Sequence, residues 1–369
     1  MKMDFSDLPD EAGTSWRPFS DKTLADAEVV VRQSFGSDVV PLLGKILRNP
    51  ALADIRAQES GDIVYCNGEP VGFEALMPRR LYLRNRMYLG SVGSTMGLKP
   101  DVSPLVLLSL MKRNIAQRCG SILWFANTAN ATSVKMNRHL GIRGCGPCTW
   151  DEIRYAVIHP FSFAAMILRR KVLRRCQKKA PELALPIRDE LVMRTGALEI
   201  RRMVKFDVKM FDAFWCGYVK ANKGLVSSRS AAELEWMFGD RLATGEDVLL
   251  VACEDGRVAG FTVLRSCQGG WWRIADLIAS GNDETILGAL LKGAKRFLRK
   301  RTGAALLTSR GFPESAMCVI GKYLPNKRPT GGNAFLWKFY DTENTRDVGD
   351  VANDANSWFF GPYDGDAEL

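Results

Sequence analysis

The sequence predicts an α/β (α+β) protein built from two tandem copies of one fold, and three observations support this. A hairpin pattern occurs twice, as GEPVGF from Gly68 and as GRVAGF from Gly256. A Leu-Leu pair is followed, twelve residues after its second leucine, by Gly120 in one copy and by Gly303 in the other. The chain has 369 residues, which is enough for two buried cores. A repeated spacing favours two copies over one large domain.

Each copy begins with a predicted hairpin and continues with a helix and a strand. The hairpin turns are centred on Asn67-Gly68 and Asp255-Gly256, dipeptides that tolerate the positive φ of a two-residue turn. Downstream, the first copy has an amphipathic helix from Leu107 to Gly120 and an apolar strand over Ser121–Ala126, and the second has a helix from Leu290 to Gly303 and a strand over Ala304–Leu307. The two copies differ by a five-residue loop before the helix.

Composition excludes several classes of protein. With 46% hydrophobic and 25% charged residues, the chain is neither disordered nor collagen-like. Its longest nearly apolar stretch, residues 155–168, is interrupted by His159 and Pro160 and is shorter than the about 20 residues of a membrane span. The N-terminal MKMDFSDLPDEAG carries acids where a signal peptide has its apolar core. We therefore expect a cytoplasmic protein whose nine cysteines stay reduced.

Charge is unevenly distributed along the chain. The formal net charge is +10, but residues 341–369 hold eight acids and one arginine, so residues 1–340 carry +17. A body this basic attracts anions, and phosphorylated cofactors, tRNA and an anionic membrane all remain candidate partners.

The densest basic run lies between the two copies, from Arg169 to Lys179. It reads RRKVLRRCQKK and follows the apolar FSFAAMIL. An apolar segment that leads into a basic helix is typical of a peripheral membrane contact, and RNA is a second candidate. A solvated helix between domains is the interpretation we favour.

The order of hairpin, strand, loop, helix, strand and helix, with a glycine after the last helix, resembles the GCN5-related N-acetyltransferase (GNAT) family in tandem. The resemblance covers roughly residues 20–158 and 196–340. RSAAELEWMF, from Arg229 to Phe238, and WFFGPYDGD, from Trp358 to Asp366, resemble segments of tandem GNAT-like proteins associated with bacterial cell-envelope polysaccharide synthesis.

The resemblance implies two domains, each a mixed, mostly antiparallel sheet flanked by helices. We expect an N-terminal domain over 1–158, a basic connecting segment over 159–195, a C-terminal domain over 196–340 and an acidic tail over 341–369.

The resemblance also implies that acetyl-CoA or another acyl-CoA is a co-substrate, with its diphosphate on backbone amides at a helix N-terminus. In the first copy the family's glycines are replaced by Pro100, Val102 and Pro104. Lys99 falls near the family's arginine and supplies a cation, Ser103 can cap the helix, and Pro104 suits its first position.

The second copy has Asn282, Asp283 and Glu284 at the start of the corresponding helix. Carboxylates there would cap the helix themselves and repel a diphosphate. We therefore expect the first half to hold the acyl donor, while the second shapes the acceptor side or completes the fold.

Transfer of an acyl group to an amine needs a base, a proton donor for the departing thiolate and amides that polarise the thioester. The family's tyrosine position, four residues before Gly141, is Asn137. His139 is nearby and could titrate near neutrality, although a surface histidine at a helix C-terminus is its ordinary role. Glu74 could act as a base through water, or could be a solvated strand residue.

Two asparagines are candidates for contact with the pantetheine. Asn127 and Asn130 follow the strand Ser121–Ala126, where the resemblance implies splayed strands, and N-capping is the alternative role of Asn130. On the preceding strand, Gly93 lies between Ser91 and Ser94 and could mark a bulge that splays the sheet.

No metal site is expected. Cys145-Gly146-Pro147-Cys148 and two distant histidines do not supply the about four ligands of a zinc site. The same motif lacks the helix that would activate a redox dithiol.

Three functions remain open at this point. The first is an N-acyltransferase that moves an acyl group, with acetyl expected, from acyl-CoA to a small-molecule amine such as an amino sugar. The second is a FemABX-like transferase that uses aminoacyl-tRNA, which the basic body would suit. The third is a catalytically inactive scaffold.

Overall fold

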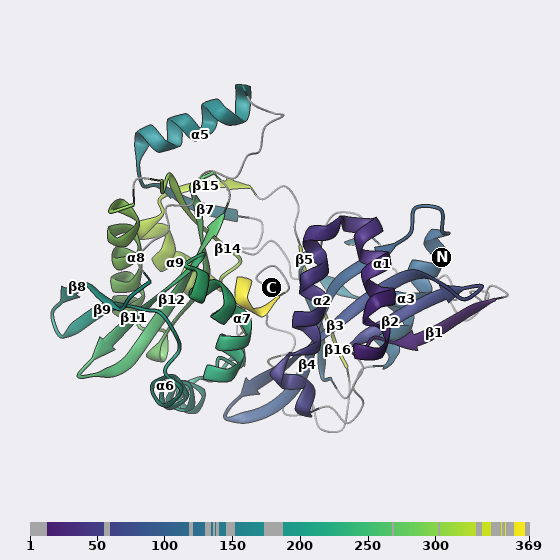
Figure 1. Ribbon diagram of the computed structural model, residues 1–369. Helices are drawn as coiled ribbons and strands as arrows, with labels where there is room; N and C mark the ends of the chain where they lie inside the picture. Colours follow the sequence, from purple (N-terminus) through teal and green to yellow (C-terminus); the bar gives the residue numbers. More distant parts are fainter. Residues whose placement is uncertain are drawn as a thin grey trace.

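The computed structural model describes residues 13–54, 60–117, 121–129, 134–135, 137, 140–144, 152–172, 187–267, 269–301, 303–329, 334–340, 348, 351 and 358–365. These residues form two mixed sheets, called sheets A and B here, with helices on both faces of each (Figure 1). The predicted architecture of two flanked sheets is confirmed.

Sheet A contains nine strands within the described residues. Its main path runs in the order β1 (Thr14–Pro18), β2 (Gly61–Cys66), β3 (Glu69–Leu83), β4 (Arg86–Leu98), β5 (Leu123–Ala129), β16 (Ala334–Phe339) and β6 (Arg143–Gly144). Off this path, β10 (Leu225–Ser227) pairs with both β3 and β17 (Trp358–Phe359). The pairs of this sheet are antiparallel except β4 with β5 and β10 with β17.

Sheet B contains eight strands within the described residues. Their order is β15 (Asn326–Pro329), β7 (Glu152–Val157), β14 (Leu306–Arg310), β13 (Trp271–Ala279), β12 (Arg257–Cys267), β11 (Asp247–Glu254), β9 (Leu198–Met203) and β8 (Glu190–Thr195). Only the pair of β13 with β14 is parallel among these strands. The main path of sheet A likewise contains one parallel pair, β4 with β5.

Both predicted hairpin turns are present. Asn67 and Gly68 have φ of 51° and 83°, and Asp255 and Gly256 have φ of 48° and 76°. Positive φ at both central residues is the signature of the type I′ turn, whose twist matches that of the flanking strands. Asparagine, aspartate and glycine adopt this conformation at low energetic cost, which explains why the sequence alone located the turns.

The two halves exchange a strand, which the sequence did not indicate. Strand β7, from the end of the predicted N-terminal domain, lies in sheet B between β14 and β15. Strand β16, from the end of the predicted C-terminal domain, lies in sheet A between β5 and β6. The ranges 1–158 and 196–340 therefore do not coincide with the two sheets. Each half supplies the strand that covers an open edge of the other, and edge strands are under pressure to be covered.

Helices cover opposite faces of sheet A. Ile63 packs with α1 (Leu24–Phe35) and α2 (Val40–Leu47), whereas the next residue, Val64, packs with α3 (Pro104–Gln117). Successive strand residues point to opposite faces, so this one pair of residues separates the two helical layers.

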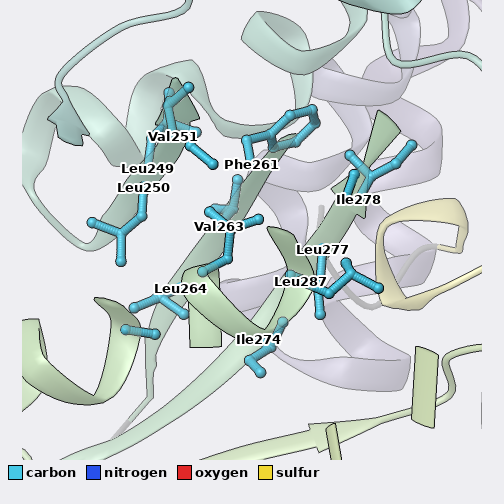
Figure 2. Packing of buried hydrophobic residues seen from close by; sticks show 14 of the residues in the cluster. Leu249, Leu250, Val251, Phe261, Val263, Leu264, Ile274, Leu277, Ile278 and Leu287 are labelled. Atoms are coloured by element: carbon cyan, nitrogen blue, oxygen red, sulfur yellow. The ribbon is translucent and has the colours of Figure 1, made fainter. Parts of the chain in front are cut away.

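Sheet B is covered in the same way by α6 (Val208–Ala221), α7 (Ala231–Thr244), α8 (Glu284–Arg299) and α9 (Glu314–Tyr323). Phe261 packs against Phe211 of α6 with 5.4 Å between ring centroids, while Gly260 faces Ile286 of α8. Leu250, Phe261 and Leu287 belong to one large cluster of buried side chains (Figure 2).

The predicted connecting segment 159–195 contains two elements of the fold. Helix α5 (Pro160–Val172) projects beyond sheet B (Figure 1), and Glu190–Thr195 forms the edge strand β8. Among the described residues, no helix is both long enough and apolar enough to span a bilayer.

The two halves are joined by buried polar contacts as well as by strand exchange. Lys45 Nζ in α2 donates to the carbonyl of Met237 in α7 at 2.7 Å, and Trp236 Nε1 donates to the carbonyl of Lys45 at 2.8 Å. The chain end described, residues 358–365, lies between the halves at the point marked C in Figure 1. Part of the predicted acidic tail is thus buried in the fold.

Candidate functional site

The two parallel strands at the centre of sheet A separate after a short contact. Strands β4 and β5 pair only over Gly90–Val92 and Leu123–Phe125. The register between β3 and β4 also shifts, because Glu74 lies opposite Met96 whereas Leu76 lies opposite Gly93. Strand β4 therefore carries an extra residue beside the point of separation, and a bulge of this kind leaves backbone groups without ladder partners.

Gly93 lies where the sheet opens, and a side chain there would collide with β5. A Cβ atom at Gly93 would lie 2.5 Å from the ring of Trp124, which is shorter than real Cβ contacts. The prediction that Gly93 marks a bulge is confirmed, and the close packing of Trp124 explains why glycine is needed there.

The junction between β4 and α3 carries the predicted anion-binding residues. Ser103 Oγ accepts a hydrogen bond from the amide of Leu105 at 3.3 Å, and α3 begins at Pro104, so the predicted cap and first helical residue are confirmed. The amide of Lys99 donates to the carbonyl of Val71 at 2.9 Å, which fixes the start of the loop. The first turn of α3 contains no acidic residue. A cation beside a helix N-terminus favours binding of an anion.

Glu74 is buried, so its role as a solvated strand residue is excluded. It lies opposite Asp62 of β2, and residues opposite each other in a ladder point to the same face. The carboxylate of Asp62 accepts a hydrogen bond from Arg113 Nε of α3 at 3.0 Å. Two buried acids therefore share the α3 face of sheet A with one arginine, while a role for Glu74 as a base stays a prediction.

The predicted residues after β5 are only partly within the described residues. Asn127 lies inside β5 and not after it, because the strand extends to Ala129. Asn137 is buried, and its carbonyl accepts from the amides of Leu140 and Ile142 at 3.0 and 3.1 Å.

Those two bonds close the turn that contains Gly141, whose φ is 72°. Asn130, His139 and the motif that begins at Cys145 lie outside the described residues. No described structure bears on their predicted roles.

The corresponding junction in the second half has the opposite chemistry. Asp283 Oδ1 accepts from the amides of Thr285 at 2.6 Å and Ile286 at 3.1 Å, so its carboxylate caps α8. Glu284 adds a second acid in the first turn. The predicted self-capping by acids is confirmed, and it places negative charge where a diphosphate would lie.

A buried ion network beside β13 was not found from the sequence. Arg229 is fully buried and donates from Nε and Nη2 to the two carboxylate oxygens of Asp276, at 3.0 and 3.1 Å. Its Nη2 also lies 3.2 Å from Asp364 Oδ2. Burial disfavours the charged guanidinium, but the two carboxylates outweigh it and raise the pKa of Arg229.

The same network holds the end of the described chain against both halves. Tyr363 Oη donates to the carbonyl of Ser228 at 2.8 Å, and Arg79 Nη2 of sheet A donates to the carbonyl of Tyr363 at 2.9 Å. The segments RSAAELEWMF and WFFGPYDGD lie far apart in the sequence, and the structure brings them into contact. Arg229 and Asp364 are 135 residues apart in the sequence, and no local sequence pattern predicts such a pair.

A pocket of about 390 Å³ lies beside the loops that follow β13 and β14. Its wall comes from the end of α6, the loop after β13, the start of α9 and β17. Tyr218 Oη donates to Asn282 Oδ1 at 3.0 Å, and burial raises the pKa of Tyr218. Lys223 is the charged residue of the wall, so the pocket favours a neutral or anionic molecule.

Within the described residues, no group of three or more His, Cys, Asp or Glu side chains is arranged to hold a metal ion.

No family model matches this chain, and no curated protein matches its sequence. Solved structures do resemble its fold. A GCN5-related N-acetyltransferase from Anabaena variabilis superposes with a TM-score of 0.55 at 11% identity, covering 88% of this chain and 72% of its own. One from Kribbella flavida gives a TM-score of 0.53 at 13% identity, covering 88% and 71%. N-myristoyltransferase from Saccharomyces cerevisiae, with bound myristoyl-CoA, gives 0.53 at 14% identity, covering 91% and 81%.

At these identities the likeness is one of fold. The two mixed sheets and their flanking helices match tandem GNAT-fold structures such as N-myristoyltransferase. The chain therefore has the tandem form of the GNAT acyltransferase fold.

Proposed function

We propose that this protein is an N-acyltransferase that moves an acyl group from acyl-CoA to a small-molecule amine. The donor would be held at the junction of β4 and α3, by Lys99, Ser103 and the first amides of α3. An acetyl donor and an amino-sugar acceptor stay predictions. The fold supports a coenzyme A thioester as donor, since the yeast N-myristoyltransferase of similar fold contains myristoyl-CoA.

The observation that carries this proposal is the difference between the two helix N-termini. In α8, the Asp283 side chain accepts hydrogen bonds from two amides, and Glu284 adds a second negative charge. In α3, the side chain of Ser103 accepts from one amide and its carbonyl from the next. No acid lies in the first turn, and Lys99 precedes Ser103 on the same loop. Asp101 on the same loop offsets part of this charge, so the backbone amides carry much of the expected attraction.

The bulge in β4 supports the chemical step. In this reaction the amine nitrogen bonds to the thioester carbon, the carbon–sulfur bond breaks, the thiolate takes a proton, and the proton of the ammonium passes to a base. Backbone amides without ladder partners can polarise the thioester carbonyl. Glu74, the last residue of β3 before the register shift, is the buried carboxylate that we propose as the base, acting through water.

The test is calorimetric titration of the protein with acetyl-CoA. Reversing the charge in Lys99→Glu should weaken binding by about tenfold or more, as expected for loss of a charge-assisted contact. Lys209→Glu is the matched control, because Lys209 is an exposed lysine of α6 in the other half. Equal affinity of wild type and Lys99→Glu would refute this placement of the donor.

A second measurement separates this proposal from a tRNA-dependent transferase. Retention on immobilised CoA and on total tRNA is followed across a salt series. A tRNA user with six or more phosphate contacts should lose affinity about a thousandfold between roughly 50 and 200 mM salt. We expect retention on CoA and weak binding to tRNA. Strong, salt-sensitive binding to tRNA without affinity for CoA would favour the FemABX-like alternative.

A further inference from the structure

Helix α5 is seated against sheet B by one apolar face, at the beginning of the central strands β13 and β14. Phe163 and Met166 pack with Ala305 and Leu306, at the start of β14, and with Trp271 of β13. The amide of Phe163 donates to the carbonyl of His159 at 2.9 Å, which begins the helix. This contact uses only one side of the helix, which otherwise stands clear of the body (Figure 1).

The opposite face of α5 is also apolar, and it faces solvent. Phe161 is 92% exposed and Leu168 is 65% exposed, and Ala164 and Ala165 between them are exposed as well. Spacings of three, four and seven residues place these four side chains on one stripe of a helix. A phenylalanine almost wholly in water, within an apolar stripe, is typical of a surface that binds a partner.

The charge around this stripe indicates what the partner is. Residues 153–181 contain no acidic residue, and α5 itself ends with Arg169, Arg170 and Lys171 before Val172. Arg328 of β15 lies over the ring of Trp271, 5.5 Å from its centroid, and Trp271 also contacts the seated face of α5. An apolar stripe beside many cations and no acids matches an anionic lipid surface, where the stripe enters the acyl boundary and the cations meet the headgroups.

We propose that α5 is a membrane-surface helix, which docks this protein on anionic bilayers through the Phe161–Leu168 stripe and the cations that follow it. RNA would use the cations but gains little from an exposed apolar stripe, and a second copy of this chain would bring the same positive charge against itself. A single amphipathic helix gives reversible attachment, so the protein would divide between solution and membrane.

The experiment is co-sedimentation of the full chain with vesicles of phosphatidylcholine, with and without about one third phosphatidylglycerol, a composition chosen for its negative surface potential. Two double variants are compared. Phe161→Ser with Leu168→Ser removes the stripe, and Leu191→Ser with Val208→Ser removes two other exposed apolar side chains, 46% and 63% exposed, as the control. All four side chains are on the surface, so both variants should fold.

We expect wild type and control to bind the anionic vesicles, and the Phe161 and Leu168 variant to bind about a hundredfold more weakly. Changing Arg169, Arg170 and Lys171 to Gln should weaken binding and remove much of its dependence on salt. Three results would overturn the proposal. They are equal binding of both double variants, absence of binding by wild type, and a fall in oligomeric mass caused by Phe161→Ser with no effect on vesicles.

Discussion

The strand–helix junctions of the two halves are built on one fold and have opposite chemistry. In both, a parallel strand pair separates and a helix begins beside the opening. At α3 a serine side chain caps the first turn and a lysine precedes it on the loop. At α8 the Asp283 side chain caps the first turn and Glu284 adds a second acid. The same backbone therefore places no carboxylate at the start of the helix in one half and two in the other, so the fold alone does not tell which half binds a ligand.

The halves also differ in how buried charge is placed. Beside sheet B, Arg229, Asp276 and Asp364 are all fully buried. Beside sheet A, buried Asp62 pairs with Arg113, whose side chain is 43% exposed. The second half thus depends on a closed ion network that includes the chain end, whereas water reaches the pair in the first half.

The largest expected effect comes from Arg229→Met. Removing the guanidinium leaves Asp276 and Asp364 buried without their partner, and should lower the free energy of unfolding by about 3 to 5 kcal/mol. Denaturant unfolding measures this loss. Arg113→Met is the counterpart in the first half and should cost about 1 kcal/mol, because that pair is partly solvated. Equal losses in the two variants would show that the halves do not differ in this respect.

A smaller effect concerns the contact of the first half with the second. Burial and nearby Arg265 lower the pKa of Lys45 to about 8, although Asp240 and Asp247 act in the opposite direction. Unfolded chains keep this proton up to the usual lysine pKa of about 10.4 and therefore bind more protons than the folded chain above pH about 8. Stability should rise with pH in that window.

The Lys45→Met variant lacks this contribution to the pH dependence of stability, so a comparison with wild type isolates it. The difference in unfolding free energy between wild type and Lys45→Met should shift by about 2 kcal/mol in favour of wild type from pH about 7.5 to about 9.5. Denaturant unfolding of both proteins at each pH measures the shift. A constant difference would mean that Lys45 is not desolvated by the second half.

The smallest effect compares the two helix caps directly. Asp283→Ala frees two amides of α8 and should lower the free energy of unfolding by about 1 kcal/mol. Ser103→Ala removes one longer hydrogen bond, of 3.3 Å, and should cost about half as much. Thermal unfolding monitored by circular dichroism measures both. A larger loss for Ser103→Ala would contradict the assignment of the stronger cap to the second half.

Much of the fold, but little of the site, followed from the sequence. The turns at Asn67-Gly68 and Asp255-Gly256 were located because their residues tolerate positive φ. The cap at Asp283 was also located from the sequence, because its side chain acts on amides only two and three residues away. The burial of Glu74 was missed, since a carboxylate in a strand gives no sign of a second acid opposite it.

What the sequence determined by itself is therefore local: two copies of a hairpin–helix–strand pattern, their turns, and the acids or serine that begin each helix. Tertiary structure alone determined that β7 joins sheet B and that β16 joins sheet A. It also determined that Arg229 pairs with Asp276, 47 residues away, and with Asp364, 135 residues away. The physical reason is the sequence separation of the contacts that fix each feature. Turns and caps are fixed by contacts within about four residues, whereas strand exchange and buried ion pairs depend on which edge and which charge remain open after both sheets have formed.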